Sequence, residues 1–190
     1  MPKLALSFDD GPDPEWTPRL LDVLRELGAH AMFFPIAPRA AAHPGVISRI
    51  VDEGHVIGLH CHEHLRHSHR SIVWGRRDTA RALDLLGSLG VRPTLWRTPW
   101  GDRASWSHQV ARENRLQVVC WTVDSHDWRG DAAADMFRAT RGGLHAGAIV
   151  LAHDGIGPGA RRTDVRETIE YTRLVAEHAT EAGLDLEPLE

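Results

Sequence analysis

The hexapeptide SFDDGP at residues 7–12 decides much of how this sequence can fold. An apolar run at residues 4–6 precedes it and predicts a buried strand, which the Gly-Pro pair brings to an end. Adjacent strand residues point to opposite faces, but the turn at a strand end can direct both Asp9 and Asp10 into one cavity. Like charges this close raise one carboxyl pKa unless a cation intervenes. The pair therefore predicts a metal site in which one carboxylate is a ligand and the other is free as a base.

The chain has 190 residues, of which 42% are apolar and 25% charged, as in ordinary soluble globular proteins. This length suffices for one well-buried core, so we expect residues 1–190 to form a single domain. A net charge of −4 argues against a nucleic-acid partner. No apolar run approaches the roughly 18 residues that a membrane span requires. No obligate protein partner is evident.

Cysteine usage and the first residues bear on the expected compartment. Cys61 and Cys120 are the only cysteines, so the chain has no disulfide framework. Met1 leads directly into the first predicted strand, without a signal peptide. We therefore expect a cytoplasmic protein, or a secreted one if a leader has been removed.

Strand-like apolar runs alternate with helical patterns along the whole chain. The expected strands are residues 3–8, 31–36, 55–60, 94–97, 117–122, 148–153 and 184–188. The expected helices are residues 17–27, 46–51, 72–89, 102–114, 131–142 and 163–182. This alternation predicts an α/β fold with a parallel sheet, either open and doubly wound or closed into a barrel. No glycine-rich phosphate loop follows the first strand, which weakens the nucleotide-binding version of the open sheet. In a barrel, reactive residues gather at the carboxyl ends of the strands, where Asp9 and Asp10 lie.

Three histidines occur in the segment HCHEH at residues 60–64, at the end of the third expected strand. In an extended segment His60, His62 and His64 would share a face, whereas in a helix or loop His60 and His64 would meet at i, i+4 spacing. Two imidazoles and Asp10 form a three-ligand set that leaves a position open for water, as catalytic zinc sites require. We favour Asp10, His60 and His64 as ligands over a solvated histidine-rich loop.

Three later strand ends carry further candidates. Arg97, before a Pro-Gly turn, is either a surface arginine or the partner that keeps Asp9 ionised. Residues 124–128 place two acids beside a tryptophan, although helix capping would also explain the acids. His153 ends an apolar strand, as either a satisfied core histidine or a general acid poised by a carboxylate. Together these groups predict metal-assisted acyl hydrolysis, with Asp9 as base and His153 as acid.

The five motifs, in this order, resemble those of the NodB-homology polysaccharide deacetylases, carbohydrate esterase family four. Residues 7–12 resemble the family's Thr-Phe-Asp-Asp-Gly-Pro motif, and residues 60–64 its His-Ser/Thr-x-x-His motif. Residues 97–101 are similar to Arg-x-Pro-Tyr-Gly, residues 124–128 to Asp-x-x-Asp-Trp, and residues 151–153 to Leu-x-His. The resemblance covers nearly the whole chain.

The resemblance implies a distorted (β/α)7-8 barrel that hydrolyses the acetamide of N-acetylated sugars, as chito-oligosaccharide or polysaccharide, and releases acetate. It implies one divalent metal, by default Zn²⁺ with Co²⁺, Ni²⁺ and Mn²⁺ as competitors, whose bound water is the nucleophile. It assigns the metal ligands and the base as above, namely Asp10, His60, His64 and Asp9. The other implied roles are His153 as acid, Asp127 supporting it, Arg97 supporting Asp9, the main-chain N–H of Trp100 as oxyanion donor, and Trp128 and Leu151 lining the acetyl pocket.

Two residues depart from the family pattern. Cys61 stands where the family has Ser or Thr, which weakens a hydrogen bond that would orient the histidine loop. Trp100 replaces a tyrosine and reshapes the substrate side of the site. One alternative is a deacylase of a small acylated metabolite that uses the same site. Another is an inactive carbohydrate-binding relative, which the presence of Asp9 and His153 argues against.

Overall fold

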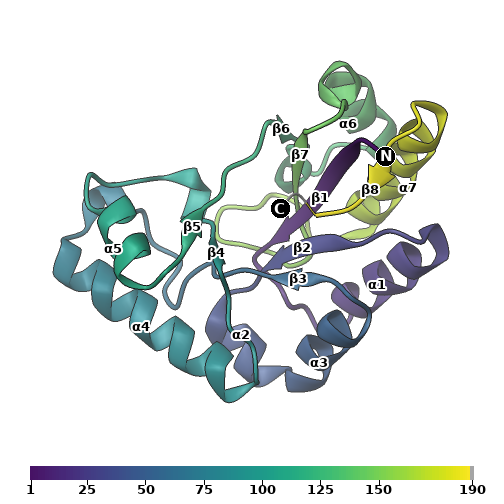
Figure 1. The fold of residues 1–190 in the computed structure, drawn as a ribbon. Coiled ribbons are helices and arrows are strands. Elements are labelled where there is room, and N and C mark those ends of the chain that lie inside the picture. Colours follow the sequence, from purple (N-terminus) through teal and green to yellow (C-terminus); the bar gives the residue numbers. More distant parts are fainter. Residues whose placement is uncertain (189–190) are drawn as a thin grey trace.

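The computed structural model describes residues 1–188, and its parallel strands form a curved sheet with helices around it (Figure 1). The larger sheet has the strand order β3-β2-β1-β7-β6, with β8 paired to the start of β1, whereas β4 pairs with β5. The strands are β1 (Lys3–Asp9), β2 (Ala31–Phe34), β3 (Val56–Ile57), β4 (Leu95–Trp96), β5 (Gln117–Val118), β6 (Val123–Asp124), β7 (Ile149–His153) and β8 (Asp185–Leu186). Because all these pairs are parallel, their carboxyl ends meet on one side of the molecule.

The two sheets join into a distorted barrel. A parallel bridge between Leu59 and Trp96 links the chain after β3 to β4. On the other side, residues 117–124 run from β5 to β6, which pairs with β7. The strands therefore follow a barrel-like path, as predicted. The single strand predicted at residues 117–122 is wrong, because β5 ends at Val118 and pairs with β4, whereas the next strand, β6, begins only at Val123 and pairs with β7.

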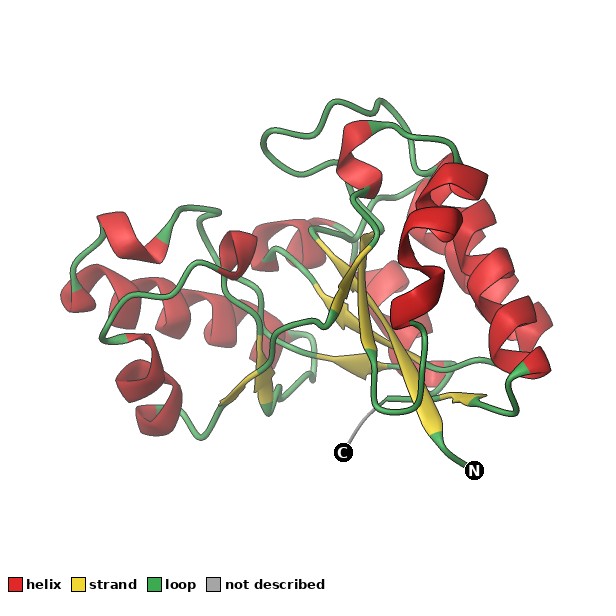
Figure 2. Cartoon of the chain, turned by 90° about the horizontal axis from the view of Figure 1, so that it is seen from above, coloured by secondary structure: helices red, strands yellow, loops and turns green. Residues whose placement is uncertain are grey.

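Helices cover the outside of the strands (Figure 2). They are α1 (Trp16–Leu27), α2 (Ala37–Ala42), α3 (Pro44–Asp52), α4 (Ile72–Ser88), α5 (Ser107–Glu113), α6 (Ala133–Thr140) and α7 (Arg166–Glu181), with short 3-10 turns η1 (His67–His69), η2 (Pro99–Gly101), η3 (Asp127–Arg129) and η4 (Arg141–Gly143). The helix α1 ends where Gly28 adopts the left-handed conformation (φ 63°), which glycine reaches without steric cost. At the start of α4, the Ser71 hydroxyl accepts the N–H of Trp74 at 3.3 Å. Among the described residues, no helix combines the length and apolar character needed to span a membrane.

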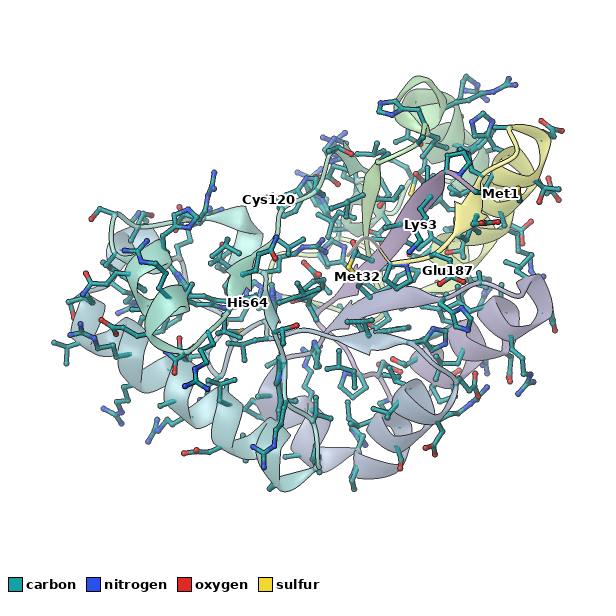
Figure 3. The ribbon with its side chains drawn as sticks, viewed as in Figure 1. Met1, Lys3, Met32, His64, Cys120 and Glu187 are labelled. Carbon is teal, nitrogen blue, oxygen red and sulfur yellow. The ribbon has the colours of Figure 1, made fainter. Side chains whose placement is uncertain are left out.

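The strands carry one core on each face. On β1, Leu4, Leu6 and Phe8 belong to the large cluster between sheet and helices, whereas Ala5 packs inside the barrel. The inner cluster also contains Met32, which Figure 3 labels on β2, and Phe34. Further along the same inner face of β1 the side chains become polar, first Ser7 and then Asp9, and both are buried. On the inner face of β1, the side chain near the amino end is therefore apolar, and those towards the carboxyl end are polar.

Candidate active site

Asp9 and Asp10 both reach one cavity because the backbone turns between them. Asp9 ends β1, opposite His153 of β7 in the parallel register. Asp10 has φ +72°, a left-handed conformation that Asp tolerates better than most residues. This turn ends the strand alternation, and the two carboxylates line the same cavity. Arg39 of α2 donates a hydrogen bond to the Asp10 carbonyl oxygen at 2.8 Å, which helps to hold the turn.

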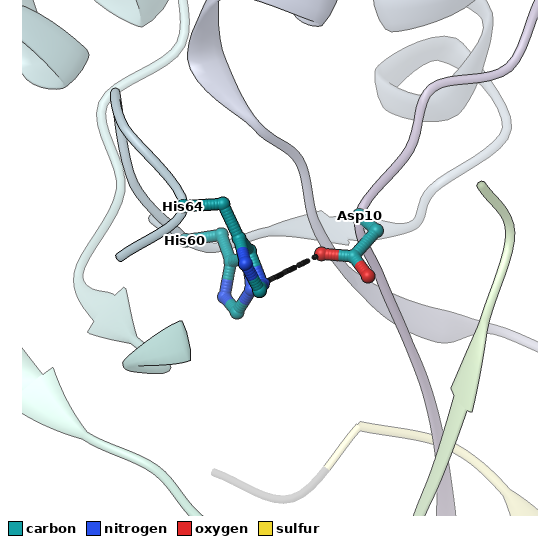
Figure 4. Close-up of side chains that lie close together, drawn as sticks. All are labelled: Asp10, His60 and His64. Carbon is teal, nitrogen blue, oxygen red and sulfur yellow. Dashed lines mark ion pairs between the residues drawn. The ribbon is translucent and has the colours of Figure 1, made fainter. Parts of the chain in front are cut away.

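Asp10, His60 and His64 converge on one point (Figure 4). The Oδ1 atom of Asp10 lies 3.3 Å from Nε2 of His60 and 3.2 Å from Nε2 of His64. Among the described residues this buried oxygen has no hydrogen-bond partner. Burial would raise the Asp10 pKa, but the two imidazoles outweigh it and hold the pKa well below its usual range. Asp10 is therefore ionised and directed at two ring nitrogens.

The orientation of His60 suits a metal ligand. Its Nδ1 lies 2.7 Å from the carbonyl oxygen of Arg97, to which it donates a hydrogen bond. This bond fixes the ring so that Nε2 faces Asp10, the position from which it can share a metal ion with that carboxylate. A carboxylate oxygen and two imidazole nitrogens form a suitable donor set for a divalent cation, with coordination positions left for other ligands. The residues present therefore fit the predicted metal.

The segment between the two histidines is turned, and the extended alternative is wrong. His62 takes no part in the group of Asp10, His60 and His64. Its main-chain N–H donates instead to Asp78 of α4 at 3.1 Å. Cys61 is buried beneath the loop, where burial raises the pKa of its thiol well above the ordinary value. The thiol therefore stays protonated and is not part of the donor set.

Arg97 contacts Asp9 directly. Its Nη1 lies 2.9 Å from Asp9 Oδ1 and also donates to Ser7 Oγ at 2.8 Å. The guanidinium is fully buried and stacks over Phe34, 4.3 Å from the ring centroid. The surface-arginine alternative is therefore wrong, and the contact suits Arg97 to hold one Asp9 oxygen in place.

A second hydrogen-bonded group surrounds His153. Its Nδ1 lies 2.7 Å from Asp127 Oδ1, and Asp127 Oδ2 accepts from Thr168 at 2.8 Å and pairs with Arg162 at 3.0 Å. Burial would raise the Asp127 pKa, but His153, Arg162 and Thr168 lower it to about 2. Burial would likewise lower the His153 pKa, but Asp127 outweighs it, and with smaller contributions from Asp10 and Asp9 raises the pKa to about 9. The imidazole is thus protonated at neutral pH, which favours the general-acid alternative over a neutral core histidine.

Asp9, Asp10, His60, His64 and His153 line one cavity of about 430 Å³, whereas Arg97 and Asp127 lie behind them and do not line it. One of these cavity-lining residues, His64, is labelled in Figure 3. Trp100, Trp128 and Leu151, which the family resemblance assigns to the substrate side, line the cavity too. The Trp100 ring packs edge-on against His64, with 4.2 Å between the centroids, and is 41% exposed. A partly exposed aromatic ring thus borders the cavity beside His64, one of the predicted metal ligands.

Several residues around the cavity escape sequence reasoning. The segment 155–160, which is rich in glycine and follows β7, provides much of one wall. A Cβ on Gly157 would lie 1.7 Å from Asp10 Oδ2, so only glycine allows this approach without displacement. Arg162 binds the carbonyl oxygens of His153 and Gly155 at 2.9 and 3.0 Å. The Gly-x-Gly-x-Gly spacing was visible in the sequence, but nothing local linked Arg162 to Asp127.

Comparisons with known proteins identify the family of this chain. Residues 1–119 match the family model described as polysaccharide deacetylase. The peptidoglycan-N-acetylglucosamine deacetylase of Bacillus cereus is 33% identical over 156 residues, covering 82% of this chain and 57% of that protein. The chitooligosaccharide deacetylase of Azorhizobium caulinodans is 31% identical over 198 residues, covering 98% and 92%. A family 4 carbohydrate esterase from Streptomyces lividans, solved in complex with acetate, superposes with a TM-score of 0.88 at 25% identity, covering 100% and 93%.

The chain therefore belongs to the polysaccharide deacetylase family, the family that its motifs resemble. It spans little more than half the length of the Bacillus cereus relative.

Proposed function

We propose that this chain is a metal-dependent N-deacetylase that hydrolyses the acetamide of N-acetylated saccharides and releases acetate. One observation carries the proposal: Asp10, His60 and His64 converge in the cavity that Asp9 and His153 also line. The names of the relatives support the same reaction, since they are deacetylases of peptidoglycan and of chitooligosaccharide.

The proposed reaction divides proton transfer between two buried groups. Asp10, His60 and His64 would hold a divalent cation, which would supply Lewis acidity towards the acetyl carbonyl and towards water. Asp9, fixed by Arg97 through one oxygen, accepts a proton from the attacking water. As the carbon–nitrogen bond breaks, His153 donates its proton to the departing amine, and Asp127 stabilises the imidazolium beforehand. Water and amide are thereby converted into acetate and a free amine.

The acetyl group would lie between the metal ligands and the apolar wall. Trp128 and Leu151 line that wall, and Trp100 borders it next to His64. The main-chain N–H of Trp100 is proposed to donate to the oxygen that becomes negative as water adds. Removing such a donor elsewhere costs about 3 kcal/mol of transition-state stabilisation.

Zn²⁺ is the metal we propose, because two imidazoles and one carboxylate form a common set for catalytic zinc. The proposed substrates are N-acetylglucosamine oligomers or polymers rather than small acylated metabolites. The tryptophans around the cavity favour this choice, because aromatic rings provide large apolar surfaces that sugar rings can cover.

A single assay tests the proposal. The protein is loaded with Zn²⁺, and released acetate is measured with N-acetylglucosamine oligomers, polymeric glycans, and a panel of simple amides and esters. We expect acetate from the glycans, abolition by a chelator, and recovery when metal is returned. Acetate release restricted to the small amides would favour the metabolite deacylase, and glycan binding without acetate release would favour an inactive relative.

A further inference from the structure

Asp78 holds the loop that carries two proposed metal ligands. It lies on α4, is 5% exposed, and directs both carboxylate oxygens at the His60–His64 loop. Oδ2 accepts the N–H of His62 at 3.1 Å, and Oδ1 accepts the N–H of Glu63 at 2.7 Å. The two contacts hold the middle of the turn, between the ligands at its two ends.

The two histidines differ in what fixes their rings. His60 is oriented by its bond to the Arg97 carbonyl oxygen, whereas the buried Nδ1 of His64 has no hydrogen-bond partner among the described residues. The ring of His64 therefore depends on the path of the loop and on its contact with Trp100. Cys61 adds no side-chain hydrogen bond in the part of the chain that the structure describes. Main-chain carbonyl oxygens at the start of the loop accept hydrogen bonds from Trp96 Nε1 and from the Ala37 N–H, at His60 and Cys61 respectively. Asp78 is the side chain that binds the N–H groups in the middle of the loop.

Burial of the Asp78 carboxylate has to be compensated by other contacts. Asp78 has no cationic partner within ion-pair distance among the described residues, and burial raises its pKa. A buried, unpaired carboxylate destabilises a fold unless hydrogen bonds compensate for the lost hydration. Here two main-chain N–H groups supply that compensation, so the carboxylate and the turned loop stabilise each other.

We propose that Asp78 is a positioning residue that prepares the His60–His64 loop for metal binding. This inference depends on the metal-dependent function proposed above. Ordering the loop before the metal arrives removes an entropic cost from metal binding, chiefly at His64. Asp78 therefore determines metal affinity without contacting the metal.

The same residues could instead suggest a second metal site. Donor atoms of His62, Glu63 and Asp78 lie within 4.8 Å of one another. Both Asp78 oxygens, however, already accept hydrogen bonds from the loop, and Glu63 is exposed and lies 3.7 Å from Arg81. The geometry therefore favours a loop anchor, and the number of bound metal ions distinguishes the two.

The test compares Asp78→Asn with Asp84→Asn, the same change at an exposed position of α4. Asn offers only one acceptor oxygen. One of the two main-chain N–H groups would therefore face the NH₂ group of Asn and lose its hydrogen bond. Zinc affinity and stoichiometry of the metal-free proteins are measured by competition with a chromophoric chelator. We expect one ion per wild-type chain, affinity about 10- to 100-fold weaker in Asp78→Asn, and no change in Asp84→Asn.

A measurement on the wild-type protein covers the case in which Asp78→Asn does not fold. In the metal-free protein, hydrogen exchange of the His62 and Glu63 amides should be slowed markedly relative to an unstructured chain. Free exchange of both amides, or unchanged zinc affinity in a folded Asp78→Asn, would overturn the positioning role. Two ions in the wild type and one in Asp78→Asn would overturn it in favour of a second site. If the wild type binds no metal, the proposed function fails as well.

Discussion

Asp9 and Asp10 are neighbours in the chain, yet their surroundings suit them to different tasks. Asp10 faces two imidazoles, whereas Asp9 is held by a buried guanidinium. Asp9→Asn should therefore bind zinc almost as the wild type does but lose turnover by orders of magnitude, because the amide cannot accept the proton. Metal content and kcat of the variant check this. Asp10→Asn is the matched control and should lose zinc, whereas zinc loss confined to Asp9→Asn would mean that the two roles are exchanged.

The pair of His153 and Asp127 predicts how activity depends on pH. The acid must be protonated, and with its pKa at about 9 the turnover should fall as pH rises past that value. Asp127→Asn removes the anion that stabilises the imidazolium, so the alkaline limb should move to lower pH. His153→Ala should lower kcat by about 10²- to 10⁴-fold with zinc affinity retained. Profiles of kcat against pH test this. An alkaline limb at the same pH in Asp127→Asn as in the wild type would show that Asp127 does not raise the His153 pKa.

Asp154, next to His153, predicts how stability depends on pH. Burial, with lesser contributions from Asp10 and Asp9, raises its pKa to about 7 despite a 2.6 Å hydrogen bond from Thr17. The folded state therefore keeps a proton that the unfolded chain loses near the ordinary value of 3.8, so stability falls as pH rises from about 4 to 7. Asp154→Asn should lose less unfolding free energy between pH 5 and pH 8 than the wild type. Urea unfolding of the metal-free proteins measures this, and an equal loss in both would refute it.

At the scale of a loop, the segment after β7 packs its main chain against Asp10, one of the proposed metal ligands. Gly157→Ala places a methyl group 1.7 Å from Asp10 Oδ2, so the loop or the carboxylate must move. We expect zinc affinity to fall by about 10- to 100-fold, the loss that is typical when residues supporting a metal ligand are changed, while the overall fold is kept. Gly45→Ala, in α3, is the control because its Cβ would have nothing within 4 Å. Equal zinc affinity in the two variants would show that the loop yields without affecting Asp10.

At the scale of helices and strands, periodicity located the long elements but missed short ones. The helix predicted at residues 72–89 is α4 (Ile72–Ser88), because the hydrophobic spacing and the Ser71 cap both lie in the local sequence. The short α2 was not predicted, since six residues show too little periodicity. The split of residues 117–122 was also not predictable, because it depends on which strands lie on either side.

For the molecule as a whole, metal binding should stabilise the fold. The three proposed ligands follow β1 and β3, which lie far apart in sequence, so unfolding separates them. At a free zinc concentration about 1,000-fold above Kd, the stabilisation is about 4 kcal/mol, which corresponds to roughly 10 °C in Tm for a chain of this size. Thermal unfolding with zinc and with a chelator measures this, and the shift should vanish in Asp10→Asn. A wild-type Tm that does not respond to zinc would contradict the site.

The order of the motifs along the chain was enough to predict the family, the barrel and the residues to examine. Each motif consists of neighbouring residues at a strand end or at a glycine or proline break, so the sequence alone contains it. The sequence also left alternatives open, such as a surface Arg97 or an extended His60–His64 segment. Tertiary structure alone decided between them, since burial and the partners of each group come from elements distant in sequence. Arg162, Asp78 and Gly157 gained their importance in the same way, through contacts that form only when the barrel closes.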